Sequence, residues 1–291
     1  MSRLLTIFTP TYNRAYIIEN LYKSLILQKN KEFIWLIVDD GSSDNTEELI
    51  KTWINENKIK IKYIKQFNQG KHIAHNTGVE NCETEFFFCV DSDDYLLENS
   101  VEDILTELNY TKKKNVAGIV SARIDKNGLV IGKELTSDVN YSSLSDLYEK
   151  YKLKGDTALI FKTEVLKKYK FPKIDEEKFI GEEYIYCQID ENYKLYISHN
   201  KYYVCEYLED GYTKNIFNLI KNNPKGYMLL KKIKLKTSKS FKIKYKSAAL
   251  YIVGAWLSNE KNIIKSSPNK IITILAMPLA KIIYKLRFKR I

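Results

Sequence analysis

Three acidic residues that follow one apolar run are the clearest sign of chemistry in this sequence of 291 residues. They are Asp91, Asp93 and Asp94, with Ser92 between the first two. A turn needs only one or two acids, and neighbouring carboxylates repel unless a cation or hydrogen-bond donors compensate. Mg²⁺ takes one or two protein carboxylates and completes its shell with water and substrate phosphates. The D-x-D pattern therefore predicts Mg²⁺ or Mn²⁺ at Asp91 and Asp93, together with a diphosphate substrate.

Other polar residues have the chemistry to bind a nucleotide. Asp40, which follows an earlier apolar run, can accept the imide N–H of uracil, and Tyr12 can stack on a base. Arg14, Lys71 and His75 are cationic candidates for the phosphates. Each also has a simpler interpretation, because the sequence around Asp40 is typical of a turn, Tyr12 could pack in the interior, and His75 could lie on a helix surface.

Short apolar runs alternate with helical patterns through the first part of the chain. The runs are residues 3–9, 33–38, 60–64 and 85–90, and the helical patterns cover residues 13–27, the stretch after Ser43 and Asp44, and 70–79. Such alternation predicts βαβ units and a mainly parallel sheet. Ligands bind such sheets beyond the carboxyl ends of the strands. We therefore expect the polar clusters to converge on one sheet edge.

Four sequence blocks, taken in order, resemble the nucleotide-sugar-binding half of family 2 glycosyltransferases. They are T-P-T-Y-N-R (9–14), V-D-D-G-S-S-D-N-T (38–46), N-x-G-K-x-x-A-x-N-x-G (68–78) and V-D-S-D-D (90–94). The resemblance covers residues 3–95 closely and extends to about residue 230. It implies an α/β, Rossmann-like GT-A fold and a UDP-sugar donor that supplies a hexosyl or N-acetylhexosaminyl group.

The resemblance also implies roles for particular residues. The residue matching Asp40 contacts uracil, and the block containing Thr9, Pro10 and Tyr12 lines the nucleoside pocket. The D-x-D, with Ser92 between its acids, faces the ribose and the metal–diphosphate. The family often carries Arg where this chain has His75, so the phosphate contact differs at that position.

The acceptor side needs a carboxylate that takes the proton from the attacking hydroxyl in an inverting transfer. Residues 154–169 and 177–184 resemble a branch of the family that makes bacterial surface, capsular or teichoic-acid-type polymers. There Glu182 matches the position of the base, Glu183 is the second candidate, and Asp156 is a candidate acceptor or donor-sugar contact. The simpler interpretation of the two glutamates is an acidic helix start favoured by the helix dipole.

The charge is divided between two parts of the chain. The total is 47 Lys+Arg against 36 Asp+Glu, a net +11. Residues 212–291 carry 19 of the basic residues and one acid, a formal charge of +18, whereas residues 1–211 carry −7. A segregated positive charge suits an anionic partner, although it could also be a solvated Lys-rich face. The sequence has none of the common nucleic-acid-binding motifs, and a nucleotidyltransferase would be expected to show a Gly-rich phosphate loop after the first strand.

We therefore expect a catalytic domain at 1–211, with a donor half at 1–95 and an acceptor half at 96–211, followed by a basic helical region at 212–291. The end of that region alternates basic and apolar residues at helical spacing, and we expect it to lie on an anionic membrane surface. The alternative is a helical bundle, which suits residues 247–257.

The remaining features concern the cellular location. The sequence shows no signal peptide, and no uninterrupted apolar stretch reaches the roughly 18 residues of a spanning helix. The four cysteines have no metal-ligand spacing and indicate reduced thiols. We expect a cytoplasmic enzyme, peripheral on the inner face of the cell membrane.

Overall fold

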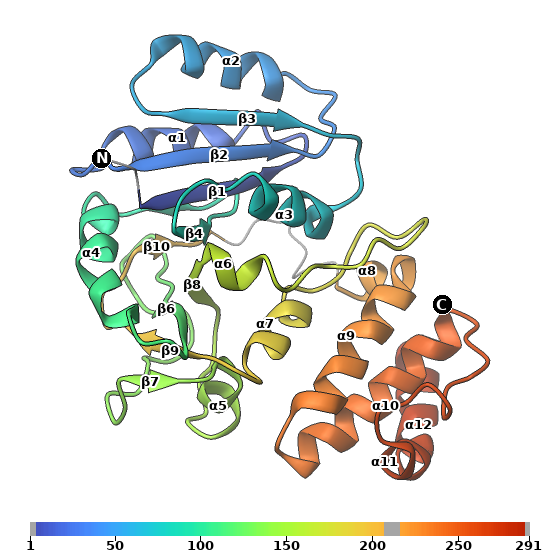
Figure 1. The fold of residues 1–291 in the computed structure, drawn as a ribbon. Helices are drawn as coiled ribbons and strands as arrows, with labels where there is room; N and C mark the ends of the chain where they lie inside the picture. The colour runs from blue at the N-terminus through green and yellow to red at the C-terminus, as the bar shows by residue number, and fades with distance from the viewer. Residues whose placement is uncertain (1–3, 207–215, 289–291) are drawn as a thin grey trace. The chain divides into compact units, whose positions relative to one another are not determined.

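The computed structural model describes residues 4–206 and 216–288 (Figure 1). They belong to two compact units. The first comprises Met1–Lys170 and Asn192–Leu208, and the second comprises Phe171–Glu191 and Glu209–Ile291. The boundary expected after residue 211 falls outside the described residues. The grouping also differs from that expectation in one respect, because Phe171–Glu191 belongs with the C-terminal helices rather than with the sheet.

The first unit is built on a mixed sheet. Its order is β3-β2-β1-β4-β8-β6-β9-β7, and β10 pairs separately with β5. The strands are β1 (Leu5–Thr11), β2 (Phe33–Asp39), β3 (Ile61–Lys65), β4 (Phe86–Cys89), β5 (Tyr95–Leu96), β6 (Val116–Ala122), β7 (Tyr141–Ser142), β8 (Thr157–Lys162), β9 (Lys194–Ile197) and β10 (Tyr203–Val204). The first four strands of the sheet are parallel, and β8 runs antiparallel to both of its neighbours. The predicted α/β fold with a mainly parallel sheet is confirmed.

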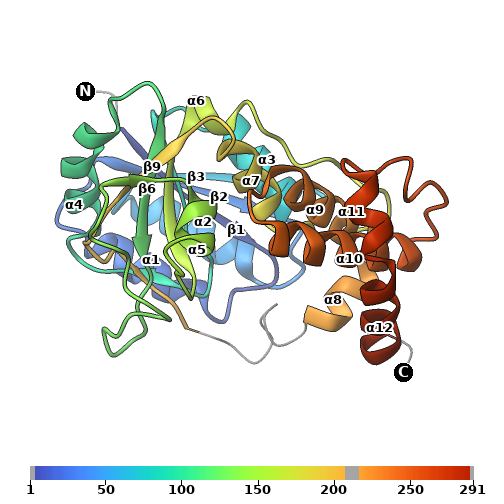
Figure 2. The ribbon, with the colours of Figure 1, turned by 90° about the horizontal axis from the view of Figure 1, so that it is seen from below.

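Helices cover both faces of this sheet (Figures 1 and 2). They are α1 (Ile18–Ile26), α2 (Thr46–Glu56), α3 (Lys71–Glu80), α4 (Ser100–Glu107), the 3₁₀ turn η1 (Leu108–Thr111), α5 (Leu144–Glu149) and α6 (Thr163–Leu166). Leu5 and Ile7 share one buried cluster with residues of α1, α2 and α4. Phe8 points to the other face, where its ring packs against Gly78 of α3. The fit is so close that a Cβ atom at Gly78 would lie only 2.4 Å from the ring. The alternation along β1 thus fixes α3 on the face opposite α1.

Two element boundaries differ from the sequence prediction. Strand β1 continues through Pro10 to Thr11 instead of stopping at residue 9. The Phe8 carbonyl accepts a hydrogen bond from the Val90 N–H, so the backbone of Phe8 faces β4. Pro10 lies two residues later and faces the same side, but the pairing of β1 with β4 ends at Phe8. The absent Pro10 N–H therefore costs no ladder bond. The helix expected from residue 13 starts only at Ile18, because the preceding residues form a turn.

The second unit is helical, as predicted for the C-terminal region. Its helices are α7 (Glu183–Ile189), α8 (Ile216–Asn222), α9 (Pro224–Thr237), α10 (Phe241–Leu257), α11 (Lys270–Leu275) and α12 (Met277–Arg287). Residues 247–257 lie in α10, which packs against α9, α11 and α12 through buried Ala248, Tyr251 and Ile252. Buried Glu177 accepts hydrogen bonds from the backbone N–H groups of Lys225 and Gly226, which holds the start of α9 against the 171–191 segment. No helix in the described part of the chain combines the length and apolarity needed to cross a bilayer.

Candidate active site

The predicted polar clusters meet at the carboxyl edge of β2, β1 and β4. Thr11 pairs with Asp39 at the end of β1 and β2, and the Asp40 N–H donates to the Thr11 carbonyl at 2.8 Å. Strand β4 ends at Cys89, opposite Phe8, so the acidic loop 91–94 begins at the same edge. The convergence expected from parallel strands is therefore confirmed.

Asp40 is held rigidly by its own chain. Its carboxylate accepts from Gln66 Nε2 at 2.7 Å, from the Gln69 N–H at 2.9 Å and from the Gly70 N–H at 2.7 Å. Gly70 adopts a φ of 93°, a conformation that suits glycine, just before α3 begins. A carboxylate has about four acceptor sites, and two of the three bonds fall on Oδ1. Within the described part of the chain, one acceptor site on Oδ2 is left for a ligand N–H.

The acidic loop lies beside a positively charged side chain. Lys71, the first residue of α3, places Nζ 2.7 Å from Asp91 Oδ1. Burial, and then the neighbouring charge of Asp91, raises the pKa of Asp93, while the positive charges of Arg14 and Lys71 oppose the rise. Two partly desolvated carboxylates beside one another form a donor set that suits a hard divalent cation.

Asp94 differs from the other two acids because its oxygens are used within the protein. Tyr203 OH donates to Oδ2 at 2.6 Å, and the Glu206 N–H donates to Oδ1 at 3.1 Å. The side chain is buried, and burial together with the charge of Asp91 raises its pKa to about 7. Ser92 is also buried. Asp94 therefore belongs to the support of the loop, and Asp91 and Asp93 are its more accessible acids.

Tyr12 and Arg14 lie on the turn after β1. Tyr12 is 49% exposed, which removes the alternative of interior packing. The Arg14 guanidinium donates to Tyr16 OH and lies 5.7 Å from the centre of that ring. The turn itself is fixed by Asp44, which accepts from the Ala15 N–H at 3.1 Å and from the Thr46 N–H at 3.1 Å. Asp44 thus joins this turn to the start of α2, whose N-cap residue is the neighbouring Asn45.

Two candidates are buried within the fold. The Thr9 hydroxyl accepts from Trp35 Nε1 at 3.0 Å inside the core. His75 was given a surface position as its simpler alternative, and that alternative is wrong because only 6% of the residue is exposed. Its ring packs edge-on against Phe8 and Phe87, with centroids 5.9 and 5.4 Å away. Thr9 is therefore hydrogen-bonded within the core, and His75 packs against the sheet.

The acceptor candidate Asp156 lies just before β8 and is exposed. Because β8 is antiparallel to β4, with Ile160 opposite Phe88, its first residues extend past the carboxyl end of β4. Asp156 therefore lies toward the same edge of the first unit as the acidic loop.

The two glutamates belong to the second unit. Glu182 is the N-cap residue of α7 and accepts from Tyr186 OH at 3.3 Å. Glu183 forms an ion pair with Lys234 Nζ at 2.7 Å. Although burial opposes it, the positive charges of Lys234 and Lys231 lower the pKa of Glu183. Both residues do start a helix, as their simpler interpretation requires.

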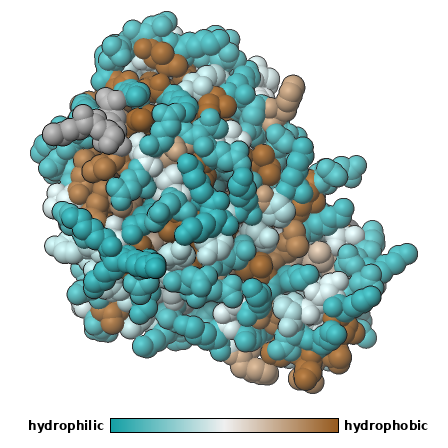
Figure 3. Space-filling view, viewed as in Figure 1, coloured by the Kyte–Doolittle hydropathy of each residue, from teal (hydrophilic) through white to brown (hydrophobic). Residues whose placement is uncertain are grey.

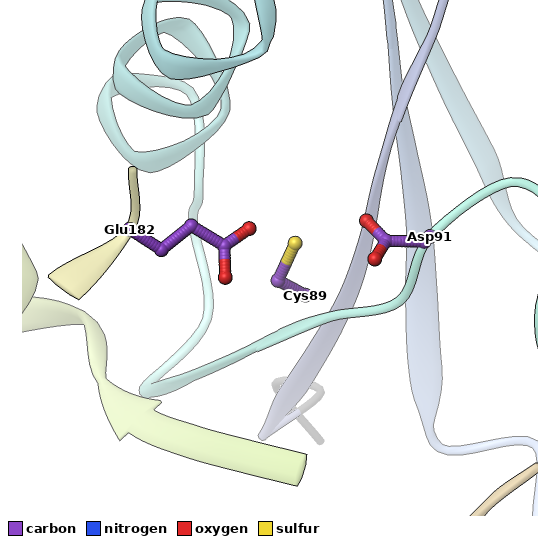
Figure 4. Close-up of side chains that lie close together, drawn as sticks. All are labelled: Cys89, Asp91 and Glu182. Atoms are coloured by element: carbon purple, nitrogen blue, oxygen red, sulfur yellow. The ribbon is translucent and has the colours of Figure 1, made fainter. Parts of the chain in front are cut away.

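Sequence reasoning missed two residues at the edge. Thr11 Oγ1 is buried and finds no hydrogen-bond partner among the described residues, so a ligand could use it. Cys89 is half-buried, and its Sγ lies within 4.8 Å of an Asp91 carboxylate oxygen. Figure 4 shows the side chains of Cys89 and Asp91. Thr11 could have been found from its place in the T-P-T-Y-N-R block. It was missed because the first strand was expected to end at residue 9.

A family model described as Glycosyl transferase family 2 matches residues 6–174, more than half of the chain. The chain belongs to this family. It is a glycosyltransferase, and its matched region contains the β1, β2 and β4 edge together with Asp40 and the acidic loop.

Several relatives of known sequence are named as glycosyltransferases. A Campylobacter jejuni protein named GalNAc(5)-diNAcBac-PP-undecaprenol beta-1,3-glucosyltransferase is 26% identical over 87% of this glycosyltransferase and 82% of its own length. Staphylococcus aureus TarP, a poly(ribitol-phosphate) beta-N-acetylglucosaminyltransferase, is 27% identical over 60% of the chain. The chain spans only 50% of TarP and 27% of Streptococcus pneumoniae GlyA.

Solved structures share the fold. S. aureus TarS 1–349 in complex with UDP-GlcNAc superposes with a TM-score of 0.63 at 20% identity, covering 99% of this glycosyltransferase and 82% of the TarS chain. Mannosyltransferase PcManGT from Pyrobaculum calidifontis, with GDP-Man and Mn²⁺, gives 0.59 at 16% identity, covering 98% and 82%. The expected GT-A fold is thereby confirmed.

Proposed function

We propose that this glycosyltransferase transfers a sugar, with inversion, from a UDP-sugar to a cell-surface glycan or lipid-linked acceptor. Asp91 and Asp93 hold a divalent cation, and Glu182 is the general base. The observation that carries the proposal is the edge where Asp40 and the acidic loop meet inside the family-matched region. Family membership favours glycosyl transfer over the nucleotidyltransferase and nucleic-acid-binding alternatives.

The donor assignment rests on Asp40 and its surroundings. Its fixed carboxylate, with one open acceptor site, suits the imide N–H of uracil, and exposed Tyr12 suits stacking on the base. Lys71 and Arg14 bring positive charge to the acidic loop, where a diphosphate would lie. The UDP-GlcNAc complex of TarS, a protein of the same fold, is consistent with this donor.

The cation assignment rests on the donor set. Asp91 and Asp93 offer hard oxygen ligands and leave room for phosphate oxygens, which is how Mg²⁺ and Mn²⁺ are commonly bound with nucleotides. A bound cation would neutralise charge on the departing diphosphate. Lys71 adds a second positive charge at the same loop.

The choice of Glu182 as base rests on its match to the family position and on the ion pair that occupies Glu183. Glu183 is paired with Lys234, and its lowered pKa makes it a poorer proton acceptor. Glu182 accepts a hydrogen bond from Tyr186 OH at 3.3 Å, and it matches the family position of the base. Its role is to take the proton of the acceptor hydroxyl as the new glycosidic bond forms and the bond to UDP breaks.

Nucleotide binding tests the donor assignment. Calorimetry with UDP, GDP, CDP and TDP, each with and without Mn²⁺, should give selective binding of UDP that strengthens with the metal. Asp40 accepts the uracil N–H, so an Asp40→Asn variant should lose the preference for UDP. Binding of none of the four nucleotides, or equal binding of all of them, would reject the UDP-sugar assignment.

The acceptor class is suggested by the relatives, since the Campylobacter enzyme is named for an undecaprenol-linked glycan and TarP for poly(ribitol-phosphate). A surface of the second unit suits a membrane setting. Exposed apolar side chains follow helical spacing along α11 and α12, with intervals of four, seven and four residues from Ile271 through Leu275 and Ile282 to Leu286, and with Ile274 beside Leu275. Figure 3 shows hydrophobic side chains gathered over α11. We name these five residues the apolar stripe.

Basic residues flank the apolar stripe, which makes an anionic membrane its best partner. Lys270, Lys281, Lys285 and Arg287 are exposed on the same two helices. The opposite side packs into the unit through Ile272, Ala276 and Ala280. An amphipathic helix of this kind lies in the bilayer interface, and each basic residue near an anionic surface contributes about 1 kcal/mol. The stripe supports a docking face on α11 and α12 rather than on the whole basic region.

Flotation with liposomes tests the apolar stripe. A variant with Ile274→Ser, Leu275→Ser and Ile282→Ser should float much less with vesicles that contain anionic lipid. Wild-type flotation should fall on purely zwitterionic vesicles, since the lysines lose their partner. The side chains are exposed, so stability should change little.

The matched control is Leu129→Ser, which removes a residue that is 66% exposed in the first unit. Flotation of the triple variant equal to that of this control would overturn the membrane proposal. Light scattering tests the alternative that the apolar stripe contacts a second copy of the chain. A wild type that self-associates, a monomeric triple variant and unchanged flotation would together assign the stripe to a second copy of the chain.

A further inference from the structure

Tyr203 occupies an unusual place in the first unit. It lies on β10, which pairs antiparallel with β5, and Tyr203 stands opposite Leu96 in that pair. Strand β5 begins at Tyr95, directly after the acidic loop 91–94. The side chain of Tyr203 is fully buried, so it contributes nothing to the molecular surface. Its ring therefore lies beneath the loop to which the proposed function assigns the cation.

The Tyr203 hydroxyl connects the two ends of the acidic loop. It accepts a hydrogen bond from the Asp91 N–H at 2.9 Å and donates one to Asp94 Oδ2 at 2.6 Å. The Asp94 N–H also donates to the Asp91 carbonyl at 3.2 Å, which closes the loop as a turn. One phenolic oxygen thus fixes the backbone at the first acid and the side chain at the last, with Ser92 and Asp93 held between them.

Further groups keep Asp94 and the Tyr203 ring in place. The Arg123 guanidinium stacks over the ring at 4.1 Å from its centre, and its Nη1 lies 3.7 Å from Asp94 Oδ2. Arg123 Nε donates to the Thr157 carbonyl at 3.1 Å, which ties this stack to the start of β8. Since the Glu206 N–H occupies Asp94 Oδ1, both oxygens of that carboxylate serve the loop's support.

We propose that Tyr203, backed by Arg123, is a positioning residue that holds the Asp91 and Asp93 carboxylates at the separation a divalent cation and a diphosphate require. The inference rests on the proposed function, because it assumes that these two acids bind the cation. Tyr203 itself touches neither donor nor acceptor. Its effect passes through the Asp91 backbone and the Asp94 side chain.

A phenylalanine substitution tests this role with a close control beside it. Tyr203→Phe keeps the ring and removes both hydrogen bonds. The concentration of Mn²⁺ that gives half-maximal UDP binding or turnover should rise about tenfold or more, the range expected when a hydrogen bond to a charged group is lost. Hydrogen exchange at the Asp91 amide should quicken as well, because that N–H loses its acceptor.

Tyr202→Phe is the matched control. Tyr202 is equally buried and adjacent in sequence, but its hydroxyl bonds to Glu107 and Ser198, away from the acidic loop. This variant should lose comparable stability and keep its Mn²⁺ requirement within about twofold of the wild type, as expected without a broken contact at the site. If Tyr203→Phe does not fold, Arg123→Gln, which leaves the hydroxyl but removes the stacked charge, should raise the Mn²⁺ requirement in the same direction.

The outcomes separate the two proposals. A wild type whose UDP binding and turnover ignore Mn²⁺ would overturn the cation assignment itself. A wild type that needs Mn²⁺, with Tyr203→Phe equal to Tyr202→Phe, would overturn the positioning role and leave the cation assignment standing. A raised Mn²⁺ requirement in Tyr203→Phe alone supports both.

Discussion

An Asp93→Ala variant is expected to lose metal-dependent UDP-sugar turnover by a hundredfold to a thousandfold. A cation on the departing diphosphate supplies several kcal/mol, and about 1.4 kcal/mol is tenfold in rate. Removing one of two protein ligands leaves the cation too weakly held to supply that stabilisation. Initial rates measured over a range of Mn²⁺ concentrations check the result. Near-normal turnover would place the cation elsewhere.

The fold of Asp93→Ala should be intact, and its stability carries an independent signature. Burial and the charge of Asp91 raise the pKa of Asp93 in the folded protein. The metal-free wild type therefore loses stability as pH rises from the ordinary aspartate pKa through the raised folded pKa of Asp93, and the variant lacks this contribution. Urea unfolding measured from about pH 4, near the ordinary aspartate pKa, upward should show the free energy of unfolding of the wild type falling relative to that of the variant.

Asp103→Ala is the matched control for Asp93→Ala. Asp103 lies on α4, and burial followed by the charge of Glu102 also raises its pKa. The substitution removes a comparable carboxylate from the same unit but away from the sheet edge. It should leave turnover and the Mn²⁺ requirement unchanged.

A Glu182→Gln variant should bind UDP and Mn²⁺ normally but turn over about a hundredfold to ten-thousandfold more slowly, the usual contribution of a general base. Glutamine keeps the shape of the side chain and the contact with Tyr186, so a large loss would come from the missing proton acceptor. Steady-state kinetics with UDP-sugar and acceptor, together with calorimetry for UDP, separate the two effects.

Glu183→Gln is the comparison that decides between the neighbours. The ion pair of Glu183 with Lys234 is half-exposed, so its loss should cost little stability and only a few-fold in rate. Slow turnover in Glu183→Gln, with Glu182→Gln close to wild type, would reverse the assignment. Equal small effects in both would remove the base from this pair altogether.

The donor edge was predictable because its causes are local. Apolar runs that end in acids are visible in the sequence, and parallel strands must bring their carboxyl ends together. Asp40 and Asp91 could therefore be placed at one edge without knowing any contact. Helix α3 was also predictable from local sequence, because Gly70 is followed by a helical pattern.

Contacts over long sequence distances could not be predicted. Tyr203 is separated from Asp91 by more than a hundred residues, and no periodicity links them. The burial of His75 on α3 depends on Phe8 of β1 and Phe87 of β4. The antiparallel β8 between β4 and β6 also departs from the βαβ pattern that predicted the first strands. Such features are set by tertiary packing rather than by local preference.

The grouping of Phe171–Glu191 with the C-terminal helices bears on how this enzyme can change over time. The chain leaves the first unit, contributes Glu182 and Glu177 to the second, and returns to complete the sheet with β9. Exchanging only the stretch after β10 with another protein would strip Glu177 of its partners at the start of α9. The proposed base and the apolar stripe are therefore inherited together. Replacing the helices after β10 would therefore also disturb the segment that carries the proposed base.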